Sequence, residues 1–257
     1  MNTIMDERPI GMFDSGCGGL TVLKEYLKEM PNEDFIYYGD TSHLPYGDKS
    51  KEKIIEYAKH IVNFLIQQNV KMIVIACGTA SALSYEELKS TYSLPIQNII
   101  TPTALNIQDK TIGVIATKGT IHSKAWENEI QKYHPDANII SVACPLFVPI
   151  VEEGFASTEI SKLVIQQYLS AFQGTNITSL ILGCTHYPIL ENQIQEVIGK
   201  NVNLINAGKQ AAVLSHQYLK ENHLQNSKEH IGKQTYYASD DFETFRENAK
   251  KMGIMIP

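Results

Sequence analysis

The feature that most constrains the fold of this chain is a regular alternation of short apolar runs with longer stretches of helical periodicity. Aliphatic strands that alternate with amphipathic helices are typical of α/β proteins with mainly parallel sheets. We therefore predict open, mainly parallel sheets covered by helices. The predicted strands are Ile10–Phe13, Ile73–Ala76, Ile112–Ala116, Ile139–Val142, Leu180–Leu182, Val202–Ile205 and Thr235–Ala238.

Two of the intervening stretches show the apolar spacing of a helix that covers a sheet. A polar segment further along, Glu221–Lys233, is expected to form a surface loop. Within Ser50–Gln68, the residues predicted to share the buried face are Ile54, Ala58, Ile61, Val62 and Leu65. Within Thr158–Phe172, the corresponding residues are Ile160, Leu163, Val164, Tyr168 and Leu169.

A faint internal duplication divides the chain into two units. In the first unit, the strand that begins at Ile10 is followed by a strand that ends in Cys77-Gly-Thr. In the second unit, the strand that begins at Ile112 is followed by one that ends in Cys184-Thr. The repeat predicts two pseudo-symmetric α/β domains. Their expected bounds are 1–98 plus 208–257 for the first domain and 99–207 for the second.

The duplication also predicts where a ligand binds. Ligands of open α/β sheets bind at the carboxyl ends of the strands, and both Cys77 and Cys184 follow such an end. If the two units face each other, they present two thiols across a shared cleft. We expect the active site in that cleft between the domains.

Composition excludes several classes of partner. The chain carries a net charge of −6 and has no cluster of Lys or Arg, so it lacks the basic surface of nucleic-acid-binding proteins. Asp6, Glu7 and Arg8 occupy positions where a signal peptide needs apolar residues. The apolar runs are far shorter than the roughly 20 residues that cross a bilayer. We expect a cytoplasmic protein with a small-molecule partner and no contact with nucleic acid or membrane.

The four cysteines are expected to act as single thiols. A cytosolic protein rarely contains disulfides, and no C-x-x-C pair indicates zinc or thioredoxin-like chemistry. No metal site is predicted. Cys17 and Cys144 lie outside the repeated context, and we interpret them as buried structural thiols.

Cys77 and Cys184 suit a reaction that moves a proton from one face of a carbon atom to the other. Inverting the α-carbon of an amino acid requires two groups on opposite sides of that carbon. A thiol has an ordinary pKa of about 8.5, and we expect a helix N-terminus after each cysteine to lower it. The alternative interpretation of both residues is a buried structural thiol.

A series of motifs resembles the glutamate racemase family. They follow the family's order and cover almost the whole chain. The motifs are Phe13-Asp-Ser-Gly-Cys-Gly-Gly-Leu-Thr-Val, Tyr38-Gly-Asp-Thr, Pro45-Tyr-Gly, Ala76-Cys-Gly-Thr-Ala-Ser-Ala, Cys144-Pro-Leu-Phe-Val-Pro, Val151-Glu-Glu-Gly, Leu182-Gly-Cys-Thr-His-Tyr-Pro and Asp240-Asp-Phe-Glu-Thr-Phe.

The resemblance implies a cytoplasmic, cofactor-independent enzyme that interconverts L- and D-glutamate and supplies D-glutamate for peptidoglycan, hence for the cell wall and cell shape. It also implies a homodimer. Cys77 is expected to exchange the proton on the D-face and Cys184 on the L-face. Asp14 and His186 are expected to assist the respective thiols, and Glu152 to support the site as a further catalytic acid.

The resemblance further implies a set of residues that bind the amino acid. Asp14-Ser-Gly-Cys-Gly-Gly is a glycine-rich turn whose backbone amides could bind an anion. The expected substrate-binding residues are Asp14, Ser15, Asp40, Pro45, Tyr46, Gly47, Gly78, Thr79, Thr117, Thr185 and His186.

Two positions depart from the family pattern. Gly78 stands where the family has an asparagine, and Asn206-Ala207 stand where it has Asp-Ser. We expect Gly78 to leave a small void beside Cys77. We also predict that Gly78→Asn increases racemisation about tenfold, because the amide restores a polar contact with the substrate.

Other functions stay open at this point. A cysteine hydrolase would use one cysteine and His186, but Leu182–His186 lacks the glycines of a nucleophile elbow. A non-catalytic or weakened amino-acid-binding protein is possible on the same scaffold. An aspartate-preferring racemase is a further alternative. A pyridoxal-phosphate racemase needs a Schiff-base lysine, and nothing around Lys118 indicates one.

Overall fold

The computed structural model describes residues 5–256 and contains two sheets whose strand pairs are all parallel. The first sheet has the order β4-β3-β1-β2-β9 and the second the order β6-β5-β7-β8. The first sheet consists of β1 (Ile10–Asp14), β2 (Phe35–Gly39), β3 (Met72–Ile75), β4 (Ile96–Asn98) and β9 (Gln234–Ala238). The second consists of β5 (Thr111–Ala116), β6 (Asn138–Ala143), β7 (Ser179–Leu182) and β8 (Asn203–Asn206).

Helices connect successive strands, as the sequence pattern predicts. In chain order they are α1 (Leu20–Glu29), α2 (Lys51–Gln67), α3 (Gly78–Thr91), α4 (Ile100–Asn106), α5 (Lys118–His122), α6 (Ala125–Tyr133), α7 (Phe147–Glu152), α8 (Glu159–Leu169), α9 (Glu191–Ile198), α10 (Ala207–Glu221) and α11 (Phe242–Lys251). Four short 3-10 turns complete the set: η1 (Thr41–His43), η2 (Tyr46–Asp48), η3 (Ser170–Phe172) and η4 (Tyr187–Leu190).

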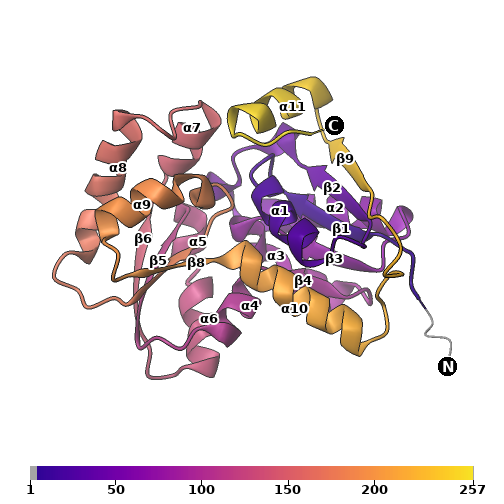
Figure 1. The fold of residues 1–257 in the computed structure, drawn as a ribbon, viewed down its shortest axis with the longest axis horizontal. Coiled ribbons are helices and arrows are strands. Elements are labelled where there is room, and N and C mark those ends of the chain that lie inside the picture. The colour runs from indigo at the N-terminus through magenta and orange to yellow at the C-terminus, as the bar shows by residue number, and fades with distance from the viewer. Residues whose placement is uncertain (1–4, 257) are drawn as a thin grey trace.

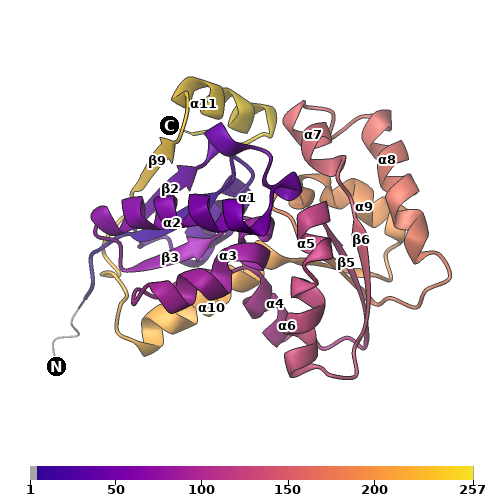
Figure 2. The ribbon, with the colours of Figure 1, turned by 180° about the vertical axis from the view of Figure 1, so that it is seen from behind.

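The two sheets form two lobes that lie side by side (Figure 1). The chain completes the second sheet, then returns through α10, which packs against α1 and α4, and adds β9 to the first sheet. From behind, α3 and α5 are seen to meet between the lobes (Figure 2). The α/β class with two parallel sheets is confirmed, whereas the domain bounds stay a prediction.

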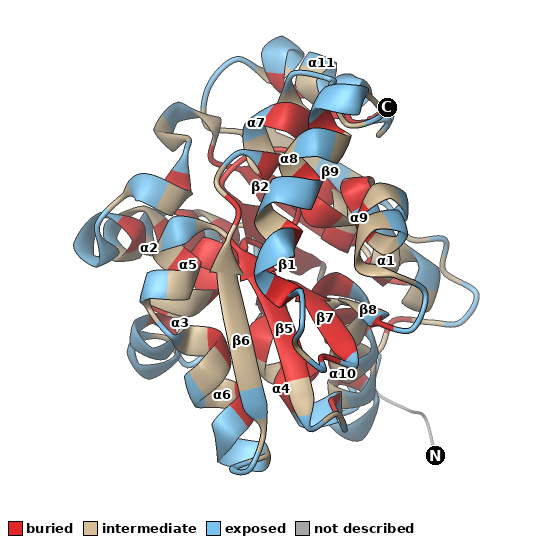
Figure 3. Cartoon of the chain, turned by 90° about the vertical axis from the view of Figure 1, so that its left-hand side faces the viewer, coloured by how far each residue is buried: buried red, intermediate tan, exposed pale blue. Residues whose placement is uncertain are grey.

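The strands differ in how deeply they are buried and in how clearly the sequence predicts them. β5 and β7 lie in the middle of the second sheet and are buried, whereas the edge strand β6 is only partly covered (Figure 3). All seven predicted strands form. β2 and β4 were not predicted, because β4 has only three residues and β2 is a short aromatic run, Phe-Ile-Tyr-Tyr-Gly.

The two predicted helix faces had different outcomes. In α2, Ser50 caps the helix. The prediction for this helix is confirmed, because its buried residues are Ile54, Ala58, Ile61, Val62 and Leu65. In α8 the prediction is wrong for Ile160 and Leu163, which are 53% and 64% exposed. It is confirmed for Leu169, which is buried, while Val164 and Tyr168 are partly buried against the core. The buried face is formed by Ser161, Ile165 and Leu169. Leu163 and Ile165 lie about 200° apart around a helix, so apolar residues on both sides obscured the true face.

Two further expectations concern the chain ends and loops. Residues 222–233 connect α10 to β9 without helix or strand, as predicted. The first four residues of the N-terminal segment lie outside the described residues. None of the helices within residues 5–256 is both long enough and apolar enough to span a membrane.

Candidate active site

The parallel sheets bring the repeated cysteines to one place. Cys77 follows β3 and Cys184 follows β7, so each lies beyond the carboxyl end of a central strand. Both line a single cavity of about 330 Å³, together with residues from both lobes. The expectation that the two thiols share a cleft between the lobes therefore agrees with the geometry.

Most of the predicted site residues line this cavity. Asp14 and Asp40 are fully or almost fully buried and lie behind it. The predicted residues in the lining are Ser15, Pro45, Tyr46, Gly47, Cys77, Gly78, Thr79, Thr117, Glu152, Cys184, Thr185 and His186. The lining residues that sequence reasoning missed are Leu44, Asp48, Lys118, Pro145, Val148 and Pro149. Of these, Pro145, Val148 and Pro149 fall within a quoted motif, which was the available signal.

Cys77 occupies the N-cap of α3 in a buried, acidic environment. Its Sγ accepts a hydrogen bond from the N–H of Ala80 at 3.5 Å and lies 3.8 Å from Oγ of Ser15. Burial raises the pKa of Cys77 to about 12, and the nearby carboxylate of Asp14 adds to the rise. The N–H of Ala80 at the start of α3 lowers this pKa, as expected of a helix N-terminus, but desolvation of the thiolate outweighs that contribution.

Cys184 lies beside a histidine that is held in its charged form. Sγ of Cys184 is 3.8 Å from Nδ1 of His186, and Nε2 of His186 is 3.1 Å from Oε1 of Glu152. Burial alone would lower the pKa of His186, but the hydrogen bonds with Cys184 and Glu152 raise it to about 10. An imidazolium therefore stands between the sulfur and the carboxylate at neutral pH.

Asp14 links the two lobes behind the cavity. Its carboxylate accepts a hydrogen bond from the N–H of Gly16 at 3.0 Å and one from the hydroxyl of Thr185 at 3.4 Å. Burial raises the pKa of Asp14 above its ordinary value, and the positive charge of His186 opposes that rise. The same carboxylate thus faces Cys77 on one side and the Thr185–His186 segment on the other.

Asp40 reaches the cavity only through another side chain. The hydroxyl of Tyr46 donates a hydrogen bond to Asp40, whose carboxylate also contacts Nδ1 of His43 at 2.8 Å. Burial and the neighbouring carboxylate raise the pKa of Tyr46, so this phenol stays a neutral hydrogen-bond donor. Asp40 positions Tyr46, which lines the cavity.

A cluster of threonine hydroxyls connects α3 with the start of α5. Oγ1 of Thr79 lies 3.0 Å from Oγ1 of Thr117, which lies 3.0 Å from Oγ1 of Thr120. Thr120 was not predicted; the signal for it is the Thr-Lys-Gly-Thr sequence, in which Thr117 caps α5. Lys118 in the same segment is exposed and is the only Lys or Arg in the cavity lining of the described residues.

The two departures from the family pattern have structural explanations. Gly78 leaves no void: a Cβ there would overlap the carbonyl oxygen of Gly183 and would lie 3.7 Å from Cα of Cys184. The expectation of a void beside Cys77 is therefore wrong, because backbone fills the space, and this contact argues against a benefit of Gly78→Asn. Asn206 caps α10 by accepting hydrogen bonds from the N–H groups of Gly208 and Lys209, a role that its amide fills as well as an acid.

The other two cysteines fit the structural interpretation. Cys17 is buried, its Sγ contacts Sδ of Met252 at 3.2 Å, and burial raises its pKa to about 12. Cys144 is also fully buried, and burial raises its pKa as well. All four cysteines are free thiols. Among residues 5–256, no group of three or more His, Cys, Asp or Glu side chains is arranged to hold a metal ion.

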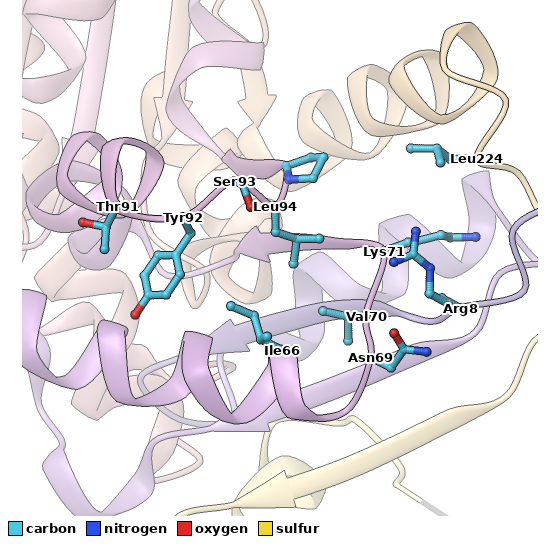
Figure 4. A pocket seen from close by; sticks show the side chains of 11 residues that line it. Arg8, Ile66, Asn69, Val70, Lys71, Thr91, Tyr92, Ser93, Leu94 and Leu224 are labelled. Atoms are coloured by element: carbon cyan, nitrogen blue, oxygen red, sulfur yellow. The ribbon is translucent and has the colours of Figure 1, made fainter.

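A second cavity, of about 560 Å³, lies at the opposite end of the first sheet (Figure 4). Its lining includes Arg8, Lys71 and Tyr92. Arg8 pairs with Asp6, and Lys71 pairs with Glu33, so both cations are neutralised. Unlike this second cavity, the cavity lined by Cys77 and Cys184 contains thiol side chains.

This arrangement defines a class of protein: two α/β lobes with parallel sheets and a thiol from each lobe in the cleft. Residues 16–214 match the model of a protein family that is described as Asp/Glu/hydantoin racemase. The chain is 41% identical to glutamate racemase of Geobacter metallireducens, with 92% of this chain and 89% of the relative covered. It is 42% identical to glutamate racemase of Lactococcus lactis subsp. cremoris, with 96% and 92% covered.

A solved structure agrees with these relatives. Glutamate racemase from Francisella tularensis, crystallised in complex with D-glutamate, superposes with a TM-score of 0.89 at 40% identity, and the match covers 98% of this chain and 96% of that one. The chain therefore belongs to the Asp/Glu/hydantoin racemase family, as the motifs indicate.

Proposed function

We propose that this enzyme interconverts L- and D-glutamate by a two-thiol mechanism. The observation that carries the proposal is the single cavity of about 330 Å³ lined by both Cys77 and Cys184. Relatives at 41% and 42% identity are glutamate racemases, and D-glutamate is bound in the structure of the Francisella tularensis relative. These comparisons support glutamate as the substrate.

In the proposed reaction, one thiol removes the α-proton and the other returns a proton to the opposite face. Starting from L-glutamate, the Cys184 thiolate takes the proton as the Cα–H bond breaks, which leaves a carbanion. The Cys77 thiol then donates its proton to the D-face, and a new Cα–H bond forms. The enzyme ends with a Cys184 thiol and a Cys77 thiolate, and proton exchange with water restores the initial state.

The surrounding residues divide between proton transfer and binding. His186, held by Glu152, supports negative charge on Cys184, while Asp14 assists at Cys77. We propose that the α-amino and α-carboxylate groups are bound by the hydroxyls of Ser15 and Thr185, the phenol of Tyr46 and the backbone of Gly47, because all four residues line the cavity. The threonine cluster and Lys118 are suited to the second carboxylate of the substrate.

In the cell, we propose that the product D-glutamate is used for peptidoglycan synthesis and that the enzyme works in the cytoplasm as a homodimer without a cofactor. This role follows from the resemblance to the family.

The test is a racemisation assay with purified protein and no added cofactor. L-glutamate, D-glutamate, L-aspartate and D-aspartate are incubated separately and followed by circular dichroism. We expect both glutamate enantiomers to approach zero ellipticity. Turnover of aspartate alone would assign an aspartate racemase, release of ammonia would indicate a hydrolase, and binding without turnover would indicate an amino-acid-binding protein.

A further inference from the structure

We propose that Gly78 is a positioning residue that sets the separation of the two thiols. Gly78 follows Cys77 directly, and Gly183 directly precedes Cys184. A Cβ on Gly78 would overlap the carbonyl oxygen of Gly183. The backbones that carry the two thiols are therefore in direct contact at this point, and the contact exists because residue 78 has no side chain.

Neither side of this contact can retreat easily. A Cβ on Gly183 would lie 2.8 Å from Nε1 of Trp126 and 2.9 Å from the carbonyl oxygen of Ile115. The N–H of Gly183 also donates to that carbonyl at 2.8 Å. Gly183 is thus backed by a buried indole and fixed to β5, so a shift of Gly183 also shifts Cys184.

The first-lobe side of the contact is equally fixed. Gly78 is the first residue of α3, where Cys77 caps the helix through the Ala80 N–H. The N–H of Ser81 donates to the carbonyl oxygen of Cys77 at 2.8 Å. A side chain at position 78 therefore pushes the helix start, together with Cys77, away from Cys184.

The expected size of this effect follows from contact distances. Relieving an overlap between a carbon and an oxygen atom requires a displacement on the order of 1 Å. Misplacement of that size can reduce a reaction rate about 100-fold. The substrate carbon must lie between the two sulfurs, so widening their separation is expected to lower kcat in both directions more than it raises KM. This catalytic consequence rests on the proposed function, whereas the spacing itself does not.

The test compares Gly78→Ala with Gly113→Ala as a matched control. A Cβ on Gly113, in β5, would lie 2.8 Å from Cδ1 of Leu180 and 3.0 Å from Cδ1 of Ile177, so the control adds a methyl group to a packed strand away from the cavity. We expect Gly78→Ala to lower kcat about 10- to 100-fold in both directions and Gly113→Ala to keep kcat. Gly78→Asn is expected to behave like Gly78→Ala.

Crystal structures of the wild type and Gly78→Ala measure the spacing independently of activity. The Sγ–Sγ distance is expected to increase on the order of 1 Å. An unchanged distance, or unchanged kcat in Gly78→Ala, would overturn the proposal. A wild type that racemises neither glutamate nor aspartate would instead overturn the proposed function, and the crystal structures would still decide the spacing. If Gly78→Ala does not fold, the same widening is expected in a Trp126→Phe background, where Gly183 has room to move.

Discussion

The two thiols occupy equivalent places in the duplicated sequence but have opposite electrostatic surroundings. Cys77 caps the long helix α3 and faces the carboxylate of Asp14, and its pKa is raised to about 12. Cys184 is followed by the short turn η4 and faces His186, whose pKa is raised to about 10. The duplication thus preserved the positions of the two sulfurs but not the charges around them.

This difference indicates that Cys77 holds its proton at neutral pH. Negative charge at Cys184 is supported by an imidazolium, whereas Cys77 keeps its proton because burial and Asp14 disfavour its thiolate. With Cys184 on the L-face, as the family resemblance implies, this state is ready for L-glutamate. In the proposed mechanism the reverse reaction requires a thiolate at Cys77, which burial and the carboxylate of Asp14 disfavour.

Removing either sulfur should have the largest effect. We expect Cys77→Ser and Cys184→Ser each to reduce racemisation by about 10³-fold or more, because a positioned acid or base contributes roughly 10²- to 10⁴-fold and a hydroxyl is a much weaker acid than a thiol. The assay is circular dichroism with each glutamate enantiomer. Cys17→Ser and Cys144→Ser are the controls, and full activity in either site variant would remove that thiol from the mechanism.

Removing the positive charge beside Cys184 should have the next largest effect. His186→Asn is expected to reduce kcat about 10²-fold. In the wild type, activity from L-glutamate should fall as the pH rises through about 10, where His186 loses its proton. The variant should lose this step in its pH profile. A profile that keeps the step would assign it to another group.

Differential alkylation compares the two thiols directly. At pH 8, iodoacetamide followed by peptide mass spectrometry should show Cys184 modified at least about tenfold faster than Cys77, because the thiolate is the reactive form and a pKa of about 12 leaves little thiolate at Cys77. D-Glutamate should protect both residues. Faster modification of Cys77 would reverse the assigned asymmetry.

The smallest effect is expected from removing an uncharged neighbour of Cys77. Ser15 contacts Cys77 at 3.8 Å without carrying charge, so Ser15→Ala should lower kcat/KM only by about 3- to 10-fold, the value of one neutral hydrogen bond. Steady-state kinetics in both directions measure it. A loss as large as that of His186→Asn would show that Cys77 depends on its partner as strongly as Cys184 does.

Much of the fold and of the site composition could be predicted from the sequence. Seven strands follow from apolar runs, and the cavity lining follows from motifs that cluster at strand ends. Short elements such as β4 carry too few residues for a pattern to emerge. In α8, apolar residues on two sides, among them the exposed Leu163 and the buried Ile165, hid the true face.

The remaining properties depend on contacts between distant segments. The raised pKa of Cys77 arises from burial and from Asp14, which precedes it by more than sixty positions. The contact of Gly78 with Gly183 exists only once the two lobes have packed together. Motif comparison shows an absent asparagine at position 78, but it cannot show that backbone fills the space.

Racemisation in deuterated water tests the two-thiol mechanism most directly. The enzyme is supplied with protonated L-glutamate, and the reaction is stopped at low conversion for analysis by NMR and mass spectrometry. If Cys184 removes the proton and Cys77 supplies a different one, the D-glutamate product carries deuterium at Cα while unreacted L-glutamate keeps its proton. Product D-glutamate that retains the substrate proton would show that a single group moves the proton between faces, and would contradict the account.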